Sequence, residues 1–506
     1  MSFSKQINAF LEKGVLLSPD VMDEHNSFDI LNELKEGHED LIYLNKDLKE
    51  IIFKKKIKIN LKEYEKANFL LEKKKAEDHS RYNVPRNNVE LVFSYNKESK
   101  KRSVNDFVSF FNSRFKELAN MLRRRQELQG LTSIVNVSKK TERENVAVIG
   151  MIKEISITRN QNIILTVEDQ TGEIKVLVNK SNEDLLKIGK DLVLDEVIGI
   201  TGVTGKNIIF SNDIYFPDIP GDKEFKKSKE KSNILFVGDL HAGSKVFLKK
   251  EFERFILWLN GTIGNEEQKE AAKNVKHVVF TGDLVEGVGV YPGQEDHLSI
   301  MDIKNQYIEL SKYLERIPPH INIIMCPGNH DAVGLAEPQV QIYKDFAECL
   351  WDLPNVYMVS NPSIVNVDKT ETFSGFDILL YHGFSLIYYS DNVESIRLAG
   401  GQKRVDLIMK FLLQKRHLAP THESNQYIPD SDSDPLVINK VPDFFVTGHI
   451  HRASASQYKN ITLINSSCWT ETTPDQEKRG LEPQPGRLFI VDLQTRKVKI
   501  MNFLGL

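Results

Sequence analysis

Five short runs between residues 238 and 451 hold aspartate, asparagine and histidine side chains that could bind metal ions. The runs are Gly238-Asp239-Leu240-His241, Gly282-Asp283, Gly328-Asn329-His330-Asp331, Tyr381-His382-Gly383 and Gly448-His449-Ile450-His451. Asp239 and His241 are two residues apart, as are His449 and His451, so in an extended segment both members of each pair point the same way. The pattern predicts a metal-binding set drawn from distant parts of the chain.

The donor types in these runs favour divalent ions of intermediate softness. Carboxylate, imidazole and amide groups suit Mn²⁺, Fe²⁺, Ni²⁺ or Zn²⁺. A carboxylate shared by two such ions would hold them about 3.5–4 Å apart, which is the spacing used in two-metal phosphoester hydrolysis. Ions in that arrangement acidify a water, orient the phosphate and stabilise the leaving oxygen. The set therefore predicts a two-metal centre that cleaves phosphoesters.

Each run directly follows an apolar stretch that is typical of a buried β-strand. The stretches cover residues 233–237, 278–280, 321–325, 376–380 and 444–446. In α/β sheets, ligands gather just outside the carboxyl ends of the strands, and all five stretches place their polar residues there. Because these stretches alternate with helical patterns, we expect a layered α/β domain over residues 233–506.

Simpler interpretations exist for single residues. One histidine or aspartate after a strand is usually a cap or turn residue, but five such runs at successive strand ends are hard to explain in that way. Asp331 could orient the His330 imidazole or cap the next turn, and both interpretations stay open. Five further histidines are expected to be surface or structural residues: His277, His297, His320, His417 and His422.

Length and composition limit the class of protein. A chain of 506 residues is too long for one core, so about two to four domains are expected. The net charge of -4 predicts no strong overall attraction to nucleic acid. The three cysteines form no CxxC pair, which favours a reducing compartment. No apolar run approaches about 18 residues and no signal peptide is evident, so we expect a cytoplasmic protein without a membrane span.

The chain before residue 233 divides into four predicted segments. Residues 1–100 are Lys-rich and are predicted to be mostly helical, with partner binding as a candidate role. Residues 101–143 form a helical connector, in which apolar residues from Phe107 to Leu122 recur at three-to-four-residue spacing. Residues 144–220 read as a barrel, and residues 221–232 as a polar linker. The triplet Arg123-Arg124-Arg125 is either a solvated helix end or a contact for phosphate or a partner.

Residues 144–220 contain five short strand-like runs, a hairpin turn at residues 169–173 and a helical insert near residues 182–188. This combination is typical of a small Greek-key barrel of the OB type. Such barrels bind single strands or dock proteins, and both functions stay open. A polar insert at residues 421–435 of the last domain is expected to be a surface loop.

Taken together, the five metal-binding runs resemble the calcineurin-like metallophosphoesterase family, whose pattern is DxH, GD, GNH(D/E), H and GHxH. The match covers residues 233 to about 470. It implies that one ion is bound by Asp239, His241, Asp283 and His451, and the other by Asp283, Asn329, His382 and His449. It also implies that His330 is a catalytic general acid or a phosphate-orienting residue.

A closer resemblance is to the small subunits of archaeal family-D DNA polymerases. It rests on the barrel ahead of the phosphoesterase domain and on four further runs: residues 290–295, 336–339, 416–420 and 441–443. The fold class is therefore multidomain, with a helical N-terminal region, an OB-like β-barrel and a layered α/β calcineurin-like phosphoesterase domain. The resemblance implies a Mn²⁺-dependent 3′–5′ exonuclease that proofreads single-stranded or frayed DNA 3′ ends for a larger, catalytic polymerase subunit.

Two other functions are compatible with the same residues. The chain could be a non-catalytic scaffold subunit of the polymerase, or a free-standing phosphodiesterase or repair nuclease. The complete ligand set argues against an inactive relative, because every metal position of the family pattern is filled.

Overall fold

A computed structural model describes residues 16–17, 43–44, 88–98, 100–473, 476, 478 and 480–504. The chain divides into two compact units, Met1–Asn83 and Val84–Leu506. In the first unit, strands β1 (Leu16–Leu17) and β2 (Tyr43–Leu44) pair in parallel. Apart from these strands and residues 88–98 and 100, the predicted N-terminal helical region lies outside the described residues.

Two six-stranded sheets form the centre of the second unit. The first sheet has the order β12 (Val356–Met358), β11 (Asn322–Cys326), β10 (Val275–Thr281), β9 (Asn233–Val237), β18 (Arg487–Asp492) and β19 (Val498–Asn502). The second has the order β16 (Ser454–Tyr458), β17 (Ile461–Asn465), β15 (Phe444–Thr447), β14 (Phe376–Leu380), β13 (Ser363–Val367) and β3 (Val89–Ser94). Strands β9 to β12 run parallel to one another in the first sheet, as do β14, β15 and β17 in the second.

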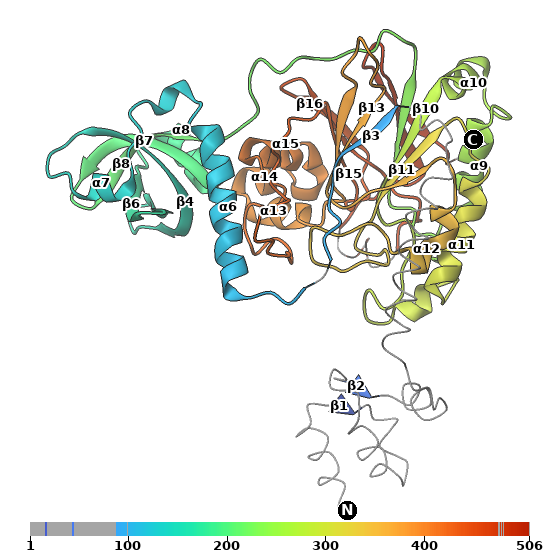
Figure 1. Cartoon of the computed structure of the whole chain (residues 1–506), viewed down its shortest axis with the longest axis horizontal. Coiled ribbons are helices and arrows are strands. Elements are labelled where there is room, and N and C mark those ends of the chain that lie inside the picture. Colours follow the sequence, from blue (N-terminus) through green and yellow to red (C-terminus); the bar gives the residue numbers. More distant parts are fainter. Residues whose placement is uncertain are drawn as a thin grey trace, which may run out of the picture. The chain divides into compact units, whose positions relative to one another are not determined.

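The two sheets pack against each other and are covered by helices on their outer faces. In β9, Ile234 and Phe236 belong to the core between the sheets, whereas Leu235 and Val237 belong to the core beneath the first set of helices. A strand that is buried on both faces needs apolar side chains at successive positions, which explains its continuous apolar run. The predicted layered α/β domain is therefore present (Figure 1).

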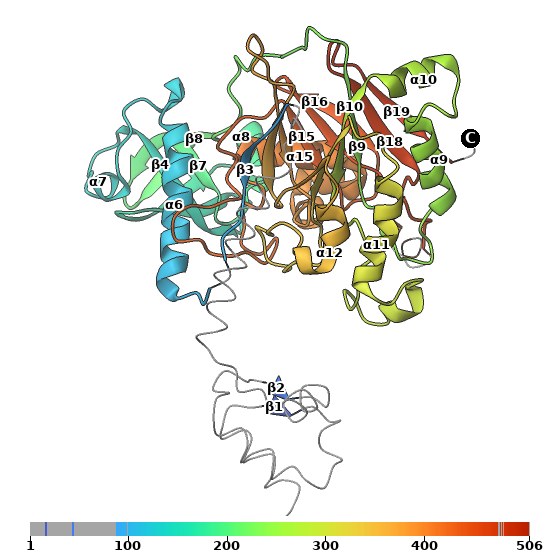
Figure 2. The ribbon, with the colours of Figure 1, turned by 45° about the vertical axis from the view of Figure 1, so that its right-hand side comes forward.

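Different helices cover the two sheets. The first sheet packs against α9 (Lys249–Leu259), α10 (Glu266–Lys273), α11 (Ile303–Leu314) and α12 (Lys344–Trp351). The second packs against α13 (Leu386–Asn392), α14 (Glu394–Leu398) and α15 (Val405–Lys415). Figure 2 shows α9, α11 and α12 on one side of the paired sheets. Among the described residues, no helix combines the length and apolar character needed to cross a bilayer.

The predicted five-stranded barrel is also present. Strands β4 (Asn145–Ile157), β5 (Ile163–Asp169), β6 (Gly172–Val178), β8 (Ile208–Tyr215) and β7 (Val197–Gly205) close in that order. Helix α8 (Glu183–Lys190) lies between β6 and β7 along the chain, where the helical insert was expected, and its N-cap Asn182 accepts a hydrogen bond from Leu185 N. The alternating residues Leu165 and Val167 of β5 point into the barrel core.

Helix α6 (Val104–Leu122) matches the predicted amphipathic helix and lies beside the barrel (Figure 1). Its N-cap Ser103 and the third helical residue, Asp106, form a capping box. On its buried face, Phe110 stacks on Tyr427 with the ring centroids 5.2 Å apart. Residues 421–435 form a loop, as expected, but only part of it is at the surface: His422 and Glu423 are exposed, whereas Thr421 and Asp434 are buried.

Residues 89–94 differ from the sequence prediction. The sequence predicts that they belong to the N-terminal helical region. Instead they form β3 at the edge of the second sheet, where β3 is antiparallel to β13 and Leu91 lies opposite Val365. The strand gains its structure from a partner about 270 residues away, which no local pattern reveals. The phosphoesterase sheets thus include chain from before the barrel as well as after it.

The segment between the barrel and β9, predicted to be a linker at residues 221–232, is also packed. Lys223 and Lys226 extend their ammonium groups to the buried carboxylate of Asp443, and the Lys226 Nζ to Asp443 Oδ2 distance is 2.9 Å. These contacts tie the segment to the residue just before β15.

Candidate metal centre

The five predicted runs meet at one edge of the paired sheets. The runs that contain Asp239, Asp283 and Asn329 follow β9, β10 and β11 of the first sheet. Those that contain His382 and His449 follow β14 and β15 of the second sheet. Because neighbouring strands are parallel, their carboxyl ends lie together, and the loops that follow them converge. All seven predicted ligand residues lie in these loops.

One group of donors is formed by Asp239, His241 and His451, whose ligand atoms lie within 4.8 Å of one another. The Nε2 atoms of His241 and His451 are 3.2 Å apart. His451 Nε2 is 3.7 Å from Asp239 Oδ1, and His241 Nε2 is 3.7 Å from Asp283 Oδ2. These four residues are the ones predicted to bind the first ion.

A second group is formed by Asp283, His382 and His449, again within 4.8 Å. Asp283 Oδ2 lies 3.3 Å from His382 Nε2, and the same nitrogen lies 3.0 Å from Asn329 Oδ1. The four residues predicted for the second ion are therefore also neighbours. Asp283 Oδ2 lies 3.7 Å from His241 Nε2 and 3.3 Å from His382 Nε2, so this carboxylate lies between the two groups, as the prediction of a shared carboxylate requires.

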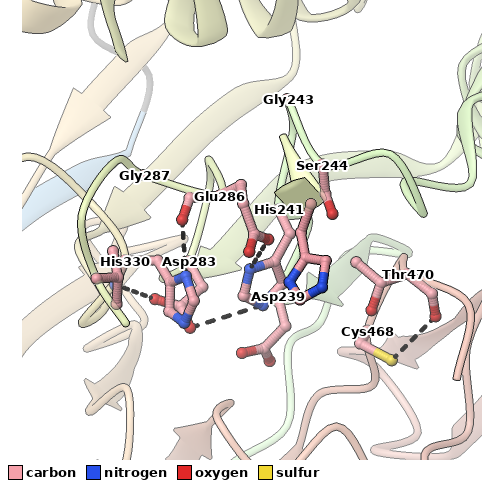
Figure 3. Close-up of polar contacts among 12 residues, drawn as sticks. Asp239, His241, Gly243, Ser244, Asp283, Glu286, Gly287, His330, Cys468 and Thr470 are labelled. Atoms are coloured by element: carbon pink, nitrogen blue, oxygen red, sulfur yellow. Dashed lines mark hydrogen bonds and ion pairs between the residues drawn. The ribbon is translucent and has the colours of Figure 1, made fainter. Parts of the chain in front are cut away.

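His330 lies at the same centre. Its backbone N–H donates to Asp283 Oδ1 at 2.8 Å, and its ring centroid is 4.6 Å from that of His241. Figure 3 shows the side chains of Asp239, His241, Asp283 and His330 gathered in one place, with Glu286 joined to His241. The catalytic candidate is thus beside the predicted ligands.

The donor set fits two divalent cations. Among the described residues, the ion-pair partners of Asp239 and Asp283 are histidines, and no lysine or arginine pairs with either carboxylate. Two imidazole nitrogens facing each other at 3.2 Å leave lone pairs directed at the same space. Oxygen and imidazole donors that are buried without a cationic side chain suit the intermediate divalent ions.

The backbone of the centre adopts unusual conformations. Asp239, His241, Asp283, His449 and His451 all have positive φ values, between 48° and 68°. This region is costly for residues with a Cβ, and such strain gathers at functional sites. All five residues lie in the loops that directly follow β9, β10 and β15.

Two glycines in the motifs are needed for space rather than for their dihedral angles. A Cβ on Gly328 would lie 2.2 Å from Asp283 Oδ1, and one on Gly448 would lie 2.7 Å from Asp239 Oδ2. Any larger residue would displace a ligand carboxylate. This agrees with the close approach expected of glycines beside ligands.

Hydrogen bonds behind the metal centre set the tautomers of His382 and His330. His382 Nδ1 donates to the Thr281 carbonyl at 2.8 Å, which leaves Nε2 as the nitrogen with a free lone pair facing the centre. His330 Nδ1 donates to the Glu286 carbonyl at 2.7 Å, and the Glu286 carboxylate lies 3.1 Å from His241 Nδ1. The sequence prediction missed Glu286, and its position three residues after Asp283 was the only available signal.

Burial and neighbouring charges act in opposite directions on the ionisation of the centre. Burial alone would lower the pKa of His241 and of His382, but Glu286 raises the first to about 9 and Asp283 raises the second to about 10. Burial lowers the pKa of His449 to about 3, and it also lowers the pKa of His330 and of His451. It raises the pKa of Asp239 to about 7. Neutral imidazoles can donate a lone pair to a cation, and a bound cation supplies the counter-charge that the buried carboxylates lack.

Asp331 caps the turn, which answers one of the open interpretations. Its carboxylate accepts from Gly328 N at 2.8 Å, from Leu284 N at 3.2 Å and from the Tyr307 hydroxyl at 3.0 Å. It therefore joins two metal-binding loops, while the His330 imidazole is oriented by the Glu286 carbonyl instead.

Two of the other histidines are structural, as expected. His277 is buried with Nε2 2.9 Å from Asp368, and His417 is buried with Nε2 2.7 Å from Asp434. Neither contributes a donor to the metal centre.

A separate hollow of about 450 Å³ lies between α6 and the barrel. Its lining is apolar and acidic: Val104, Phe107, Val108, Phe111, Asn112, Phe115, Met151, Glu168, Asp169, Gln170 and Asp195. Carboxylates repel phosphate, so this part of the barrel surface does not favour a nucleic-acid backbone. Binding of single strands elsewhere on the barrel stays a prediction.

Known proteins resemble the chain at two levels. The calcineurin-like phosphoesterase family model matches residues 232–453. The DNA polymerase II small subunit of Methanothermobacter thermautotrophicus is 35% identical over 395 residues, which cover 78% of this chain and 79% of that protein. That of Archaeoglobus fulgidus is 36% identical over 394 residues, with 78% and 76% covered. The chain belongs to the archaeal DNA polymerase II small subunits.

The family resemblance predicted from the sequence is thereby confirmed. The small subunit of Methanocaldococcus jannaschii is 38% identical over 393 residues, but the match covers 64% of that protein and 77% of this chain. The name of these relatives indicates that each is the smaller subunit of a polymerase, and the match to the calcineurin-like phosphoesterase family indicates a metal-dependent hydrolase domain in this chain.

Proposed function

We propose that this chain is the proofreading subunit of a two-subunit replicative DNA polymerase and hydrolyses the 3′-terminal phosphodiester of DNA. The observation that carries the proposal is the complete, buried donor set around Asp283 in a chain of this polymerase family. A scaffold with no catalytic role would have no need to keep seven ligand side chains converging on one space, five of them on strained backbone.

Two divalent ions, most fittingly Mn²⁺, would be held by the two groups of residues that share Asp283. When bound, they supply a water of lowered pKa and positive charge beside the phosphate. The protein's own part is positional: Asp283 holds the two groups together, and the loop backbones after β9, β10 and β15 fix the directions of the ligands.

His330 is proposed to act on the substrate itself. With Nδ1–H donated to the Glu286 carbonyl, Nε2 is the ring nitrogen that is left for the phosphate or the leaving 3′-oxygen. When protonated, it would give its proton to that oxygen, and the negative phosphate beside it would favour the protonated form that burial alone disfavours.

The substrate and partner are proposed from the family together with the charge of the chain. A net charge of -4 gives no strong general attraction to DNA, so delivery of a single-stranded or frayed 3′ end by the larger polymerase subunit fits better than independent capture. A free-standing phosphodiesterase would instead be fully active on small phosphodiesters without any partner.

The proposal is tested by digestion of end-labelled single-stranded and mismatched DNA with Mn²⁺, alone and with the larger subunit. We expect mononucleotides to be released from the 3′ end. Asp283→Ala should reduce the rate by at least about 10³-fold, since it removes the residue common to both ions. The control His320→Ala changes an exposed histidine and should leave the rate unchanged.

Two results would contradict the proposal. One is digestion that persists in Asp283→Ala. The other is a wild-type protein that assembles with the larger subunit but digests no DNA with Mn²⁺, which is what a scaffold subunit predicts.

A further inference from the structure

A buried carboxylate with no cationic partner lies behind the metal centre. Glu337 is 1% exposed, and among the described residues it forms no ion pair. Its Oε2 accepts from the Tyr381 hydroxyl at 3.0 Å and from the Asn425 amide, and its Oε1 accepts from Asn361 Nδ2 at 3.1 Å. A buried carboxylate is retained at such a cost only where its hydrogen bonds are needed.

These hydrogen bonds lead directly to a metal ligand. Asn361 Oδ1 accepts the backbone N–H of His382 at 2.8 Å, and Tyr381 is the residue that precedes His382. Glu337 therefore holds both the amide that fixes the His382 backbone and the side chain next to it. All of these groups are buried.

Gln339 extends the network to the loop of a second ligand. Its Oε1 accepts from Asn361 Nδ2 at 2.8 Å, and its Nε2 donates to the Gly328 carbonyl at 3.4 Å. Gly328 directly precedes Asn329, which shares the predicted second ion with His382. The network thus contacts the loops of two of the four residues in that group.

The backbone of Glu337 is fixed by the segment that packs against α6. Glu337 N donates to the Gln426 carbonyl at 2.9 Å, and Ile428 N donates to the Glu337 carbonyl at 2.7 Å. Between them lies Tyr427, whose ring stacks on Phe110 of α6. The position of Glu337 is therefore determined from outside the metal centre.

We propose that Glu337 is a positioning residue for the second metal ion, acting through Asn361 and Tyr381 on the ligand His382. The inference rests on the proposed metal centre. A carboxylate suits the position because it only accepts, and three donors converge on it. A glutamine would turn an NH₂ group toward at least one of these donors. Partners behind a ligand typically change metal affinity by about 10- to 100-fold when they are altered.

The test uses Mn²⁺ alone, titrated into the full chain while free Mn²⁺ is followed by electron paramagnetic resonance. The wild type should bind two ions. Glu337→Gln should weaken one of them by about 10- to 100-fold and leave the other unchanged. Asn361→Ala, which removes the acceptor of the His382 N–H, should weaken the same ion, and it serves as the second variant if Glu337→Gln does not fold.

Asp368→Asn is the matched control. It also replaces a buried carboxylate by an amide, but Asp368 contacts His277 at the start of β10, whereas the centre follows the end of that strand. This variant should bind both ions as the wild type does. Thermal unfolding of each variant shows that the comparison is made on folded protein.

Three results would overturn the inference: unchanged binding of both ions by Glu337→Gln, equal weakening in Asp368→Asn, or fewer than two ions in the wild type. The proposed exonuclease function fails separately. If the wild type binds two ions and digests no DNA, that function is wrong while the role of Glu337 stands.

Discussion

Two polar clusters in this molecule both combine aspartate with histidine but differ in charge balance. The metal centre gathers carboxylates and imidazoles around Asp283. The second cluster, which we call the α6 anchor, consists of Arg114, His417 and Asp434. In the anchor, one carboxylate oxygen of Asp434 accepts from Arg114 Nε at 2.6 Å and lies 2.7 Å from His417 Nε2, while the other accepts from Leu436 N at 2.9 Å.

The difference separates a structural cluster from one that is built for a ligand. In the α6 anchor, each donor meets an acceptor within the chain, so the charge is compensated on folding. In the metal centre, imidazole nitrogens face each other, and the carboxylates have only histidines as ion-pair partners among the described residues. A buried set of carboxylates whose ion-pair partners are imidazoles suits a cation from outside.

The largest effect is expected when a ligand is removed from the metal centre. His451→Ala should lower kcat for 3′-end digestion by about 10³-fold or more, because the first ion loses one of its four predicted ligands. The unfolding free energy without metal should not fall. The substitution removes only an imidazole whose Nε2 lies 3.2 Å from the Nε2 of His241. Rates at saturating Mn²⁺ and urea unfolding in chelator measure the two quantities. If His451→Ala lost much stability but kept a normal kcat, the metal centre would be a structural cluster like the α6 anchor.

The opposite result is expected for the α6 anchor. Arg114→Met should lower the unfolding free energy by about 3–5 kcal/mol, because it leaves the buried Asp434 carboxylate without its cation. The folded fraction should retain its Mn²⁺ affinity. The control Arg123→Met changes an exposed arginine at the end of the same helix and should have little effect. A loss below about 1 kcal/mol in Arg114→Met would show that the anchor contributes little.

The smallest effect is a pH dependence confined to the α6 anchor. Burial alone would raise the pKa of Asp434, but Arg114 and His417 hold it well below its usual range. A lowered folded-state pKa gives stability that is fully present above the unfolded pKa of about 3.9, decreases below it, and is gone once the pH has fallen through the folded-state pKa. The stability gap between wild type and Asp434→Asn should shrink by roughly 0.5–1 kcal/mol from pH 7 to pH 3.5. The control Asp184→Asn changes an exposed carboxylate and should have the same stability as the wild type at both pH values. If the stability difference between wild type and Asp434→Asn grew as the pH fell, the pKa of Asp434 would be raised and not lowered on folding.

The metal centre could be predicted from the sequence because its signals are local. Each ligand directly follows a strand that is buried on both faces, and such strands have continuous apolar runs that are easy to recognise. The predicted runs at residues 233–237 and 376–380 coincide with β9 and β14. Parallel strands then bring the loops together without any further information about packing.

The residues that support the centre could not be predicted in the same way. Glu337 and Glu286 belong to no spacing pattern of metal ligands, and their roles depend on hydrogen bonds across the fold. The pair Arg114 and Asp434 is separated by 320 residues. The polar composition of residues 421–435 predicts a surface loop. Its buried carboxylate, Asp434, can be recognised only when its partners Arg114 and His417 are known. Strand β3 is also not predictable from local sequence, because it depends on pairing with β13, which lies about 270 residues away.

The most direct test of the account is a crystal structure of the chain grown with Mn²⁺, with anomalous scattering used to locate the ions. We predict two anomalous peaks that share Asp283. One should lie among Asp239, His241 and His451, and the other among Asn329, His382 and His449. Absence of both peaks, or a single ion without Asp283 as a ligand, would contradict the claim that this uncompensated cluster is a two-metal centre.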